Sequence, residues 1–369
     1  MRIPFYSLDP IHQPIKKEIL DSIGSIIDQN AFIQGQEVHN FEMAFAAFCN
    51  STFAIGVGNG LDALKIALKT LNIGPGDEVI VPAHTYIATW LAVSELGALP
   101  VPVDANPDTM NLDPSLLQAC ISPKTKAIIP VHLYGLPCEM DTISALAKAY
   151  QLPIVEDFAQ AQGASYANQP VGSFGILNGT SFYPSKNIGA MGDAGAITTS
   201  DAELYQKASM IKNYGSKKRY IHELQGVNSR LDTFQAAILT IKLKQLSAHN
   251  LERKKLANRY QENLGKHPKI KLQSIPKACE SVYHLFVIRV KERDSLQQHL
   301  EQHGVTTLIH YPLPPHLQKA YGHLHFKRGS FPVAEQIASE ALSLPLFVGM
   351  EMSEVDYVSQ TILSFLNKL

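Results

Sequence analysis

The stretch FAIGVGNGLDALKIALKTLNIGPGDEVIVPAHTYIATWLAV, residues 53–93, decides the fold class. Two short runs in it, 53–57 and 78–82, are apolar without alternation, which is typical of strands covered on both faces of a sheet. The segment between them repeats apolar residues at helical spacing, and the segment 86–96 predicts a second helix. A strand, a helix and another strand in this order indicate a parallel βαβ unit.

The same alternation continues on the C-terminal side of this stretch. Further strands are predicted at 99–104, 125–133 and 152–157, and further helices at 140–150 and 201–213. Repeated units of this kind predict an α/β fold with a mostly parallel central sheet and right-handed crossovers.

Beyond these units the character of the sequence changes. A polar loop is expected at 213–232, followed by one long helix, straight or bent, at 233–260, and later strand-like runs such as 283–290 alternate with amphipathic helices. A chain of 369 residues is too long for one hydrophobic core. We therefore predict a large domain, 1–250, that includes the N-terminal segment, and a smaller C-terminal α/β domain, 251–369.

The charge balance of the chain limits its partners. The formal net charge is −1 and the sequence pI is about 6.9. A protein that holds nucleic acid through a general basic field needs an excess of Lys and Arg, so no nucleic-acid partner is expected. An anionic ligand would have to be bound by a local site.

The cysteines and the apolar segments indicate in which cellular compartment the protein is expected. Cys49, Cys120, Cys138 and Cys279 are far apart and form no CxxC pair, so neither a metal site nor a redox pair is predicted. The N-terminal residues lack the apolar core of a signal peptide, and the longest apolar runs are too short to span a bilayer. We expect a cytoplasmic protein without a membrane partner.

Three local patterns fall where parallel sheets bind ligands, at the carboxyl ends of strands. Asp157 ends an apolar strand, although an Asp there also suits a helix N-cap. Lys186 lies among glycines in SFYPSKNIGAMGDAGAITT (181–199), although a solvated loop lysine has the same surroundings. Gly58-Asn59-Gly60 joins a strand to a helix, which suits either a phosphate site or a plain tight turn.

Taken together, the three patterns supply what one cofactor needs. Pyridoxal phosphate requires a lysine for its aldehyde, a carboxylate for its pyridinium nitrogen and N–H donors for its phosphate. Asp157 would keep the ring protonated, so that the ring accepts electrons from the substrate. Lys186 would hold the cofactor as a Schiff base and, once released, move a proton between the substrate and the cofactor.

The chain resembles the DegT/DnrJ/EryC1/StrS family of sugar aminotransferases nearly from end to end. The resemblance rests on ordered motifs that include FIQGQEVHNFE (32–42), GNGLDALKIAL (58–68), VEDFAQAQGA (155–164), SFYPSKNIGAMGDAG (181–195) and GVNSRLDTFQAAIL (226–239). It implies an aspartate-aminotransferase-like fold and a homodimer with active sites at the interface. The family's dehydratases carry histidine in place of the lysine, so Lys186 places this chain outside that branch.

The resemblance also implies roles for individual residues. Lys186 and Asp157 would be the catalytic pair, Tyr86 would stack on the cofactor ring, and Gln160 would lie beside the ring hydroxyl. Leu61 stands where many relatives have Thr, so its N–H remains and a hydroxyl contact to phosphate is lost. The expected cofactor-binding residues are Gly60, Leu61, Tyr86, Asp157, Gln160, Ser181, Lys186 and, reaching in from the other subunit, Asn228.

The motifs NGLDAL (59–64), NSRLDTFQAAIL (228–239) and IHYPLPPHLQKAY (309–321) resemble one branch of the family. They imply amination at C3 of a dTDP-linked 3-keto-6-deoxyhexose, with L-glutamate as amino donor and a surface polysaccharide as destination. Amination at C4 and another nucleotide carrier stay open. A pyridoxal-phosphate-binding regulator is the alternative from another class. It would need a DNA-binding module, and the roughly 50 residues before the first strand are too few and too neutral for one.

Four further residues are candidates for substrate contact. His310 and Tyr311 would line the sugar pocket, although the HYP sequence also suits a structural turn. Tyr183 would touch the sugar or pack as a core aromatic. Arg219 would bind the pyrophosphate, because a guanidinium suits bidentate phosphate contact, although its basic cluster also suits a solvated surface.

Overall fold

A seven-stranded sheet forms the centre of the molecule, which is a computed structural model that describes residues 2–368. Bridges between Ile128 and Ile154 and between Val131 and Asp157 join a three-stranded and a four-stranded part. The strands follow one another across the sheet as β1 (Phe53–Val57), β9 (Gly195–Thr199), β8 (Leu177–Ser181), β5 (Val155–Asp157), β4 (Thr125–Ile128), β2 (Glu78–Pro82) and β3 (Leu99–Val103).

The sheet is mostly parallel, as predicted. β2 runs parallel to β3 and β4, and β5 runs parallel to β8. Only β9, among the strands described, runs antiparallel to both of its neighbours in this sheet. The end of β8 and the start of β9 therefore lie at the same edge of the sheet, and the loop 182–194 leaves and returns there. That edge is also where β5 ends.

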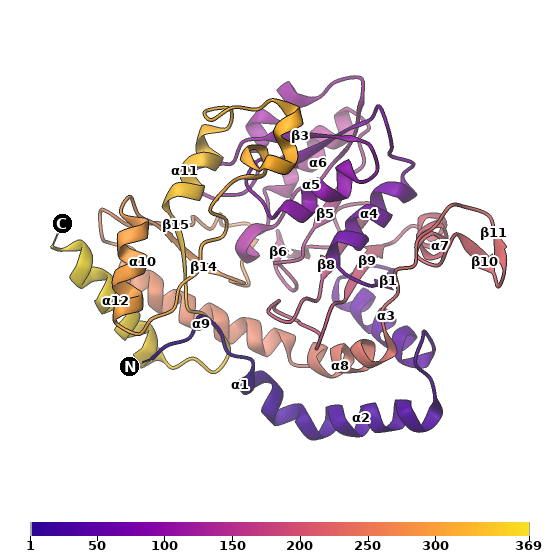
Figure 1. The fold of residues 1–369 in the computed structure, drawn as a ribbon, viewed down its shortest axis with the longest axis horizontal. Helices are drawn as coiled ribbons and strands as arrows, with labels where there is room; N and C mark the ends of the chain where they lie inside the picture. The colour runs from indigo at the N-terminus through magenta and orange to yellow at the C-terminus, as the bar shows by residue number, and fades with distance from the viewer. Residues whose placement is uncertain (1, 369) are drawn as a thin grey trace.

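Helices cover both faces of the sheet, as Figure 1 shows. One apolar cluster, which includes Leu64, Trp90 and Ile197, lies under α4 (Gly60–Thr70), α5 (Ile87–Ser94) and α7 (Ala202–Ile211). A second cluster, which includes Phe41, Phe45, Phe158 and Phe182, packs against α3 (Gln36–Phe48) and α8 (Thr233–Leu243). α6 (Met140–Ala149) covers a third cluster beside β4 and β2.

A second α/β unit follows in the C-terminal part of the chain. Its antiparallel sheet has the order β12 (Lys271–Leu272), β14 (Phe286–Arg289) and β15 (Ala341–Leu344). Its own apolar core packs this sheet against α9 (Leu246–Leu264), α10 (Arg293–Gln302) and α12 (Met352–Leu366). The division into 1–250 and 251–369 stays a prediction, because α9 crosses the proposed boundary without a break.

Two sequence predictions for the middle of the chain need correction. The segment 233–260 forms two helices, α8 and α9, because α8 packs on α2 and α3 whereas α9 packs on α12. The polar loop 213–232 contains a short hairpin, β10 (Ser216–Lys218) and β11 (Ile221–His222). Figure 1 shows this hairpin projecting from the far end of the molecule from the C-terminal unit.

The N-terminal segment connects the two units. Ile3 is fully buried in the C-terminal core, where its N–H donates to Gly304 O and its carbonyl accepts from Thr306 N. The chain then passes through α1 (Asp9–His12) to α2 (Lys16–Gln29), which packs against α8 of the large unit. The N-terminal segment was assigned to the large domain, but its first described residues contact the small one.

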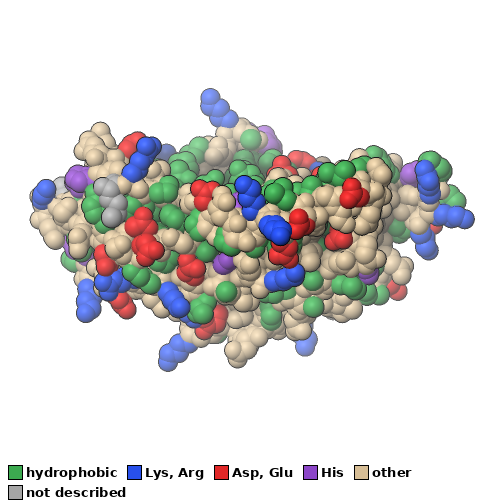
Figure 2. Space-filling view, turned by 90° about the horizontal axis from the view of Figure 1, so that it is seen from below, with side chains coloured by type: hydrophobic (Ala, Val, Ile, Leu, Met, Phe, Trp, Pro, Cys, Tyr) green, Lys and Arg blue, Asp and Glu red, His purple; other side chains and the backbone are tan. Residues whose placement is uncertain are grey.

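The surface carries both signs of charge. Figure 2 shows Lys and Arg side chains interspersed with Asp and Glu over the face in view, in agreement with the net charge near zero. Within residues 2–368, none of the helices has both the length and the apolar character that crossing a membrane requires.

Candidate active site

A cavity of about 560 Å³ opens at the carboxyl edge of the central sheet. It lies where the first turns of α4 and α5 meet the ends of β5 and β8, which is the expected place for a ligand in such a sheet. Segments from both α/β units line it. Ten of the residues singled out in the sequence lie in its wall: Gly60, Leu61, Tyr86, Asp157, Gln160, Ser181, Tyr183, Lys186, His310 and Tyr311.

The first turn of α4 provides N–H groups on one side of the cavity. The Asn59 side chain caps the helix by accepting from Asp62 N at 2.8 Å, which leaves the amides of Gly60 and Leu61 without an intrahelical acceptor. Gly60 also lies against β8, since a Cβ added to it would be 2.6 Å from the Ser181 Cβ. This close approach brings the Ser181 hydroxyl beside the free N–H groups, and together they suit a phosphate group.

Asp157 ends β5 at the floor of the cavity, where 8% of its surface is exposed. Its Oδ2 accepts from the Thr89 hydroxyl at 2.9 Å, and its Oδ1 accepts from Ala159 N at 3.2 Å. Burial raises the pKa of this carboxyl, and the two hydrogen bonds and the charge on Lys186 oppose that shift. The cavity therefore contains a buried carboxylate whose ionised form is stabilised by two hydrogen-bond donors and a nearby lysine.

Lys186 lies in the 182–194 loop between β8 and β9. The loop is fixed by Lys186 N, which donates to Tyr183 O at 2.8 Å, and by Ala190 N, which donates to Phe182 O at 2.7 Å. Burial lowers the pKa of the Lys186 amine to about 8, against the opposing charge of Asp157. An amine with this pKa is partly unprotonated near neutral pH, as a nucleophile for a carbonyl carbon must be.

Gln160 and Tyr311 are held together beside Asp157. Gln160 Oε1 accepts from Tyr134 N at 2.7 Å, and its Nε2 donates to the Tyr311 hydroxyl at 3.0 Å. The remaining amide proton of Gln160 and the hydroxyl proton of Tyr311 are available to other acceptors. The rings of Tyr86 and Tyr311 are 5.4 Å apart at an angle of 37°, so two aromatic faces border the cavity.

His310 is fixed by neighbours on two sides. Its Nδ1 lies 2.8 Å from the Ser343 hydroxyl, and its carbonyl accepts from the Tyr134 hydroxyl. Tyr134 is in turn contacted by His84 Nε2 at 2.7 Å. Burial and the charge on Lys186 lower the pKa of His310 to about 4, so His310 offers a neutral imidazole to the cavity at neutral pH.

Arg219 and Asn228 lie outside the cavity of their own chain. Arg219 is in the turn of the projecting hairpin, with its guanidinium 5.0 Å from the centre of the Tyr220 ring. Asn228 is exposed, and its Nδ2 donates to the Tyr214 hydroxyl at 2.7 Å. Basic side chains also gather at the end of the molecule where this hairpin projects, as Figure 2 shows.

Sequence analysis missed several residues of the site. His284 lines the cavity and contacts Asn187 Oδ1 through its Nδ1 at 3.0 Å, but it is the second residue of a run that was interpreted only as a strand. Thr89 contacts Asp157, but it lies inside a segment that was interpreted only as a helix. A polar residue within an apolar run was the signal available for both.

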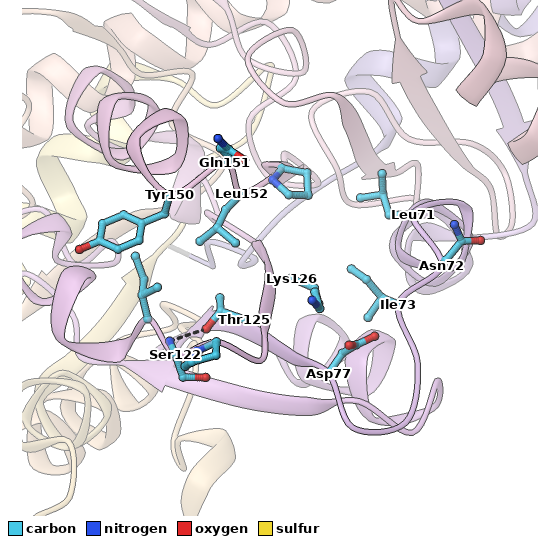
Figure 3. Close-up of a pocket in the computed structure, with 13 residues that line it drawn as sticks. Leu71, Asn72, Ile73, Asp77, Ser122, Thr125, Lys126, Tyr150, Gln151 and Leu152 are labelled. Atoms are coloured by element: carbon cyan, nitrogen blue, oxygen red, sulfur yellow. Dashed lines mark hydrogen bonds between the residues drawn. The ribbon is translucent and has the colours of Figure 1, made fainter.

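A second hollow, of about 860 Å³, lies at the opposite edge of the sheet (Figure 3). It is bordered by the segments that precede β2, β4 and β5, and it includes Asp77, Lys126 and Tyr150. Among its lining residues described here, no buried polar side chain lacks a hydrogen-bond partner. Its Asp77 is only partly buried and its Lys126 is exposed, so the hollow has no counterpart of the buried carboxylate Asp157.

The donors and charges of the first cavity fit pyridoxal phosphate. Free N–H groups and a serine hydroxyl suit the phosphate, Asp157 suits a protonated ring nitrogen, and the Lys186 amine suits the aldehyde. Within residues 2–368, no group of three or more His, Cys, Asp or Glu side chains could hold a metal ion.

Comparisons with known proteins point to the same chemistry. The profile of the DegT/DnrJ/EryC1/StrS aminotransferase family matches residues 13–363. The dTDP-3-amino-3,6-dideoxy-alpha-D-galactopyranose transaminase of Aneurinibacillus thermoaerophilus is 48% identical over 360 residues, which cover 98% of each chain. The dTDP-3-amino-3,4,6-trideoxy-alpha-D-glucose transaminase of Streptomyces venezuelae is 46% identical over 345 residues, 94% of this chain and 91% of that one. The X-ray structure of S. venezuelae DesV in complex with a ketimine intermediate matches with a TM-score of 0.97 and 44% identity, and covers 99% of this chain and 98% of that one.

Proposed function

Because the chain belongs to the DegT/DnrJ/EryC1/StrS aminotransferase family and is a pyridoxal-phosphate-dependent aminotransferase, we propose that it aminates a dTDP-linked 3-keto-6-deoxyhexose at C3. L-Glutamate would donate the amino group, and the product would be a dTDP-3-amino-3,6-dideoxyhexose. The two relatives described above support this substrate class, because both are named as transaminases of dTDP-3-amino sugars.

One observation carries the catalytic assignment: Lys186 and Asp157 line the same cavity as the free N–H groups of α4. The bound cofactor supplies an electron sink for the substrate's Cα–H bond. Asp157, as the anion, would stabilise a proton on the ring nitrogen. Lys186 would hold the aldehyde through its amine and would serve as the general acid and base.

The other cavity residues would bind and orient. Gly60, Leu61 and Ser181 would hold the phosphate, Gln160 would lie beside the ring hydroxyl, and Tyr86 would cover one ring face. Tyr183 and Tyr86 have more than half of their surface exposed in a single chain, which supports contact with an incoming sugar. His310 and Tyr311, which the C-terminal unit contributes, would contact the same sugar.

We also propose that the active unit is a homodimer with shared sites. Asn228 and Arg219 lie on an exposed, projecting segment and outside the cavity of their own chain. Asn228 would reach the phosphate of the partner's cofactor, and Arg219 would bind the pyrophosphate of the nucleotide. The reaction would take place in the cytoplasm, and its product would enter a surface polysaccharide. All four cysteines are free thiols, which supports a reducing compartment.

The test is amination of defined sugars. Purified protein with pyridoxal phosphate and L-glutamate is incubated with a 3-keto and a 4-keto dTDP-sugar, and the products are analysed by mass and NMR. We expect an amino group at C3 and loss of turnover in Lys186→Ala. Lys126→Ala, at the opposite edge of the sheet, is the matched control and should retain activity.

The alternatives predict different outcomes of the same assay. Amination of only the 4-keto sugar would contradict the C3 assignment and keep the catalytic residues. If a UDP-linked keto sugar is added as a third substrate and only it is aminated, dTDP is not the nucleotide carrier. Bound cofactor without amination of either dTDP-sugar would show that the enzyme uses another acceptor.

A further inference from the structure

Two buried threonines form a chain of hydroxyl groups that ends on Asp157. Thr85 and Thr89 have 2% and 0% of their surface exposed. Thr85 Oγ1 lies 3.1 Å from Thr89 Oγ1, which lies 2.9 Å from Asp157 Oδ2. A carboxylate can only accept, so the single proton of the Thr89 hydroxyl points to Asp157. The Thr89 oxygen must then accept from Thr85, which fixes the direction of the whole chain.

The start of α5 sets this geometry. Tyr86 is the N-cap of the helix, and Thr89 N donates to Tyr86 O at 3.3 Å in the first turn. Residues three apart share one face of a helix, so the turn that places Tyr86 at the cavity also directs Thr89 towards the floor of the cavity. Because Thr is β-branched and this one is buried, its hydroxyl has little freedom to turn away.

The hydroxyl chain opposes the effect of burial on Asp157. The carboxyl lies in a site with little water, and burial favours its neutral, protonated form. Its oxygens accept from two donors of the protein, Thr89 and the N–H of Ala159, and the Thr89 bond is the shorter at 2.9 Å against 3.2 Å. A hydroxyl polarised by a second hydroxyl is a stronger donor to an anion than an isolated one.

We propose that Thr89, backed by Thr85, is a positioning residue that keeps Asp157 ionised and aimed at the ring nitrogen of the cofactor. The proposal rests on the role proposed above for Asp157. Thr89 itself does not line the cavity, so it acts only through the carboxylate, whereas Thr85 lies in the cavity wall. The other titratable groups that interact with Asp157 are Lys186, His132, Tyr311 and Cys138, and Glu156 precedes it in the strand.

Three substitutions separate the hydroxyl from the rest of the side chain. Thr89→Val keeps the shape and removes the donor, Thr89→Ser keeps the donor, and Thr85→Val removes the hydroxyl one step further back. None of them changes the other charged groups around Asp157. For each protein, the dissociation constant of pyridoxal phosphate from the apo-protein and the pH profile of the bound cofactor's visible absorption are measured.

We expect Thr89→Val to weaken cofactor binding roughly tenfold to a hundredfold, as for the loss of one hydrogen bond to a charged group. Without the donor, Asp157 takes up a proton at higher pH, so the acid limb of the absorption profile moves to higher pH. Thr89→Ser should restore both properties, and Thr85→Val should shift both in the same direction by a smaller amount. A merely structural role for Thr89 would leave the acid limb unmoved.

Asp157→Asn distinguishes the role of Thr89 from the role of Asp157 itself. If Asp157→Asn impairs cofactor binding whereas Thr89→Val matches the wild type in both measurements, the inference about Thr89 is overturned. If Asp157→Asn leaves the dissociation constant and the pH profile unchanged, the role proposed for Asp157 is contradicted. Should Thr89→Val fail to fold, Thr85→Val decides: a shifted acid limb supports the proposal, and an unshifted one overturns it.

Discussion

At the scale of single residues, burial and neighbouring charges shift the pKa values of Lys186 and Asp157 in opposite directions. Burial lowers the pKa of the Lys186 amine, while the charge of Asp157 raises it. Burial raises the pKa of Asp157, while Thr89, Ala159 and Lys186 lower it. The amine and the carboxylate thus stabilise each other's charge, and each is held closer to its uncharged form than it would be in water.

The lowered pKa of Lys186 predicts a pH dependence of cofactor uptake. The amine is protonated and unreactive below its pKa of about 8, and it is free above it. The rate at which apo-protein takes up pyridoxal phosphate should therefore rise with pH and reach half of its maximum near pH 8. Stopped-flow absorbance between pH 6.5 and 9.5 measures this, at roughly one-unit precision. A midpoint near the ordinary lysine value would contradict the assignment.

Sequence alone could identify the residues whose chemistry is written into local patterns. Lys186 and Asp157 were predicted from three patterns taken together, because each pattern alone also suits a loop lysine or a helix N-cap, and the structure brings both residues to one cavity. Thr89 and His284 could not be identified, because their roles depend on what faces them across the fold. Asn228 was predicted from the resemblance and Arg219 from the geometry of its guanidinium, and a single chain brings neither into its own cavity.

At the scale of elements, the first turn of α4 makes a specific demand on Gly60. A Cβ at this position would be 2.6 Å from the Ser181 Cβ, so Gly60→Ala must push α4 away from β8. We expect the dissociation constant of pyridoxal phosphate to rise about tenfold and the free energy of unfolding to fall by about 1–3 kcal/mol. Equilibrium dialysis and urea unfolding measure the two quantities.

Gly24→Ala is the matched control for this substitution. Gly24 lies inside α2, where an added Cβ would meet no atom within 4 Å. Alanine there should raise the free energy of unfolding by about 0.5–1 kcal/mol and leave cofactor binding unchanged. Equal losses of cofactor affinity in both variants would show that the close packing at Gly60 is unimportant.

Element prediction succeeded where burial coincides with apolar composition. β1 and β2 were predicted from apolar runs and are buried except at their first residue, whereas β3, also predicted, is buried at three of its five residues. β8 was not predicted, because its sequence LNGTS is polar. Its Asn178 is nevertheless fully buried, since the side-chain amide donates to Gly172 O at 2.9 Å and to other acceptors nearby. The hydrogen-bond partners of a buried polar side chain come from distant parts of the chain, so the spacing of apolar residues in the sequence does not reveal them.

At the scale of the whole molecule, shared sites predict complementation between two inactive variants. Lys186→Ala and Asn228→Ala chains are mixed after unfolding and refolded together. If Asn228 acts in the partner's site, each hybrid dimer has one complete site. A 1:1 mixture should then recover about a quarter of the wild-type activity, because half of the dimers are hybrids. If Asn228 acts in its own chain, the mixture stays as inactive as its parents.

The reversed direction of β9 has a consequence for how this scaffold can change. Because β8 and β9 are antiparallel neighbours, the connection between them needs no crossover helix and begins and ends at the same edge of the sheet. The loop that carries Lys186 therefore starts and ends at neighbouring points of the sheet and forms a self-contained segment. Its length and its reactive side chain can be exchanged while the register of the sheet is kept. New chemistry can be introduced by replacing this one loop, while the strands of the central sheet keep their order and pairing.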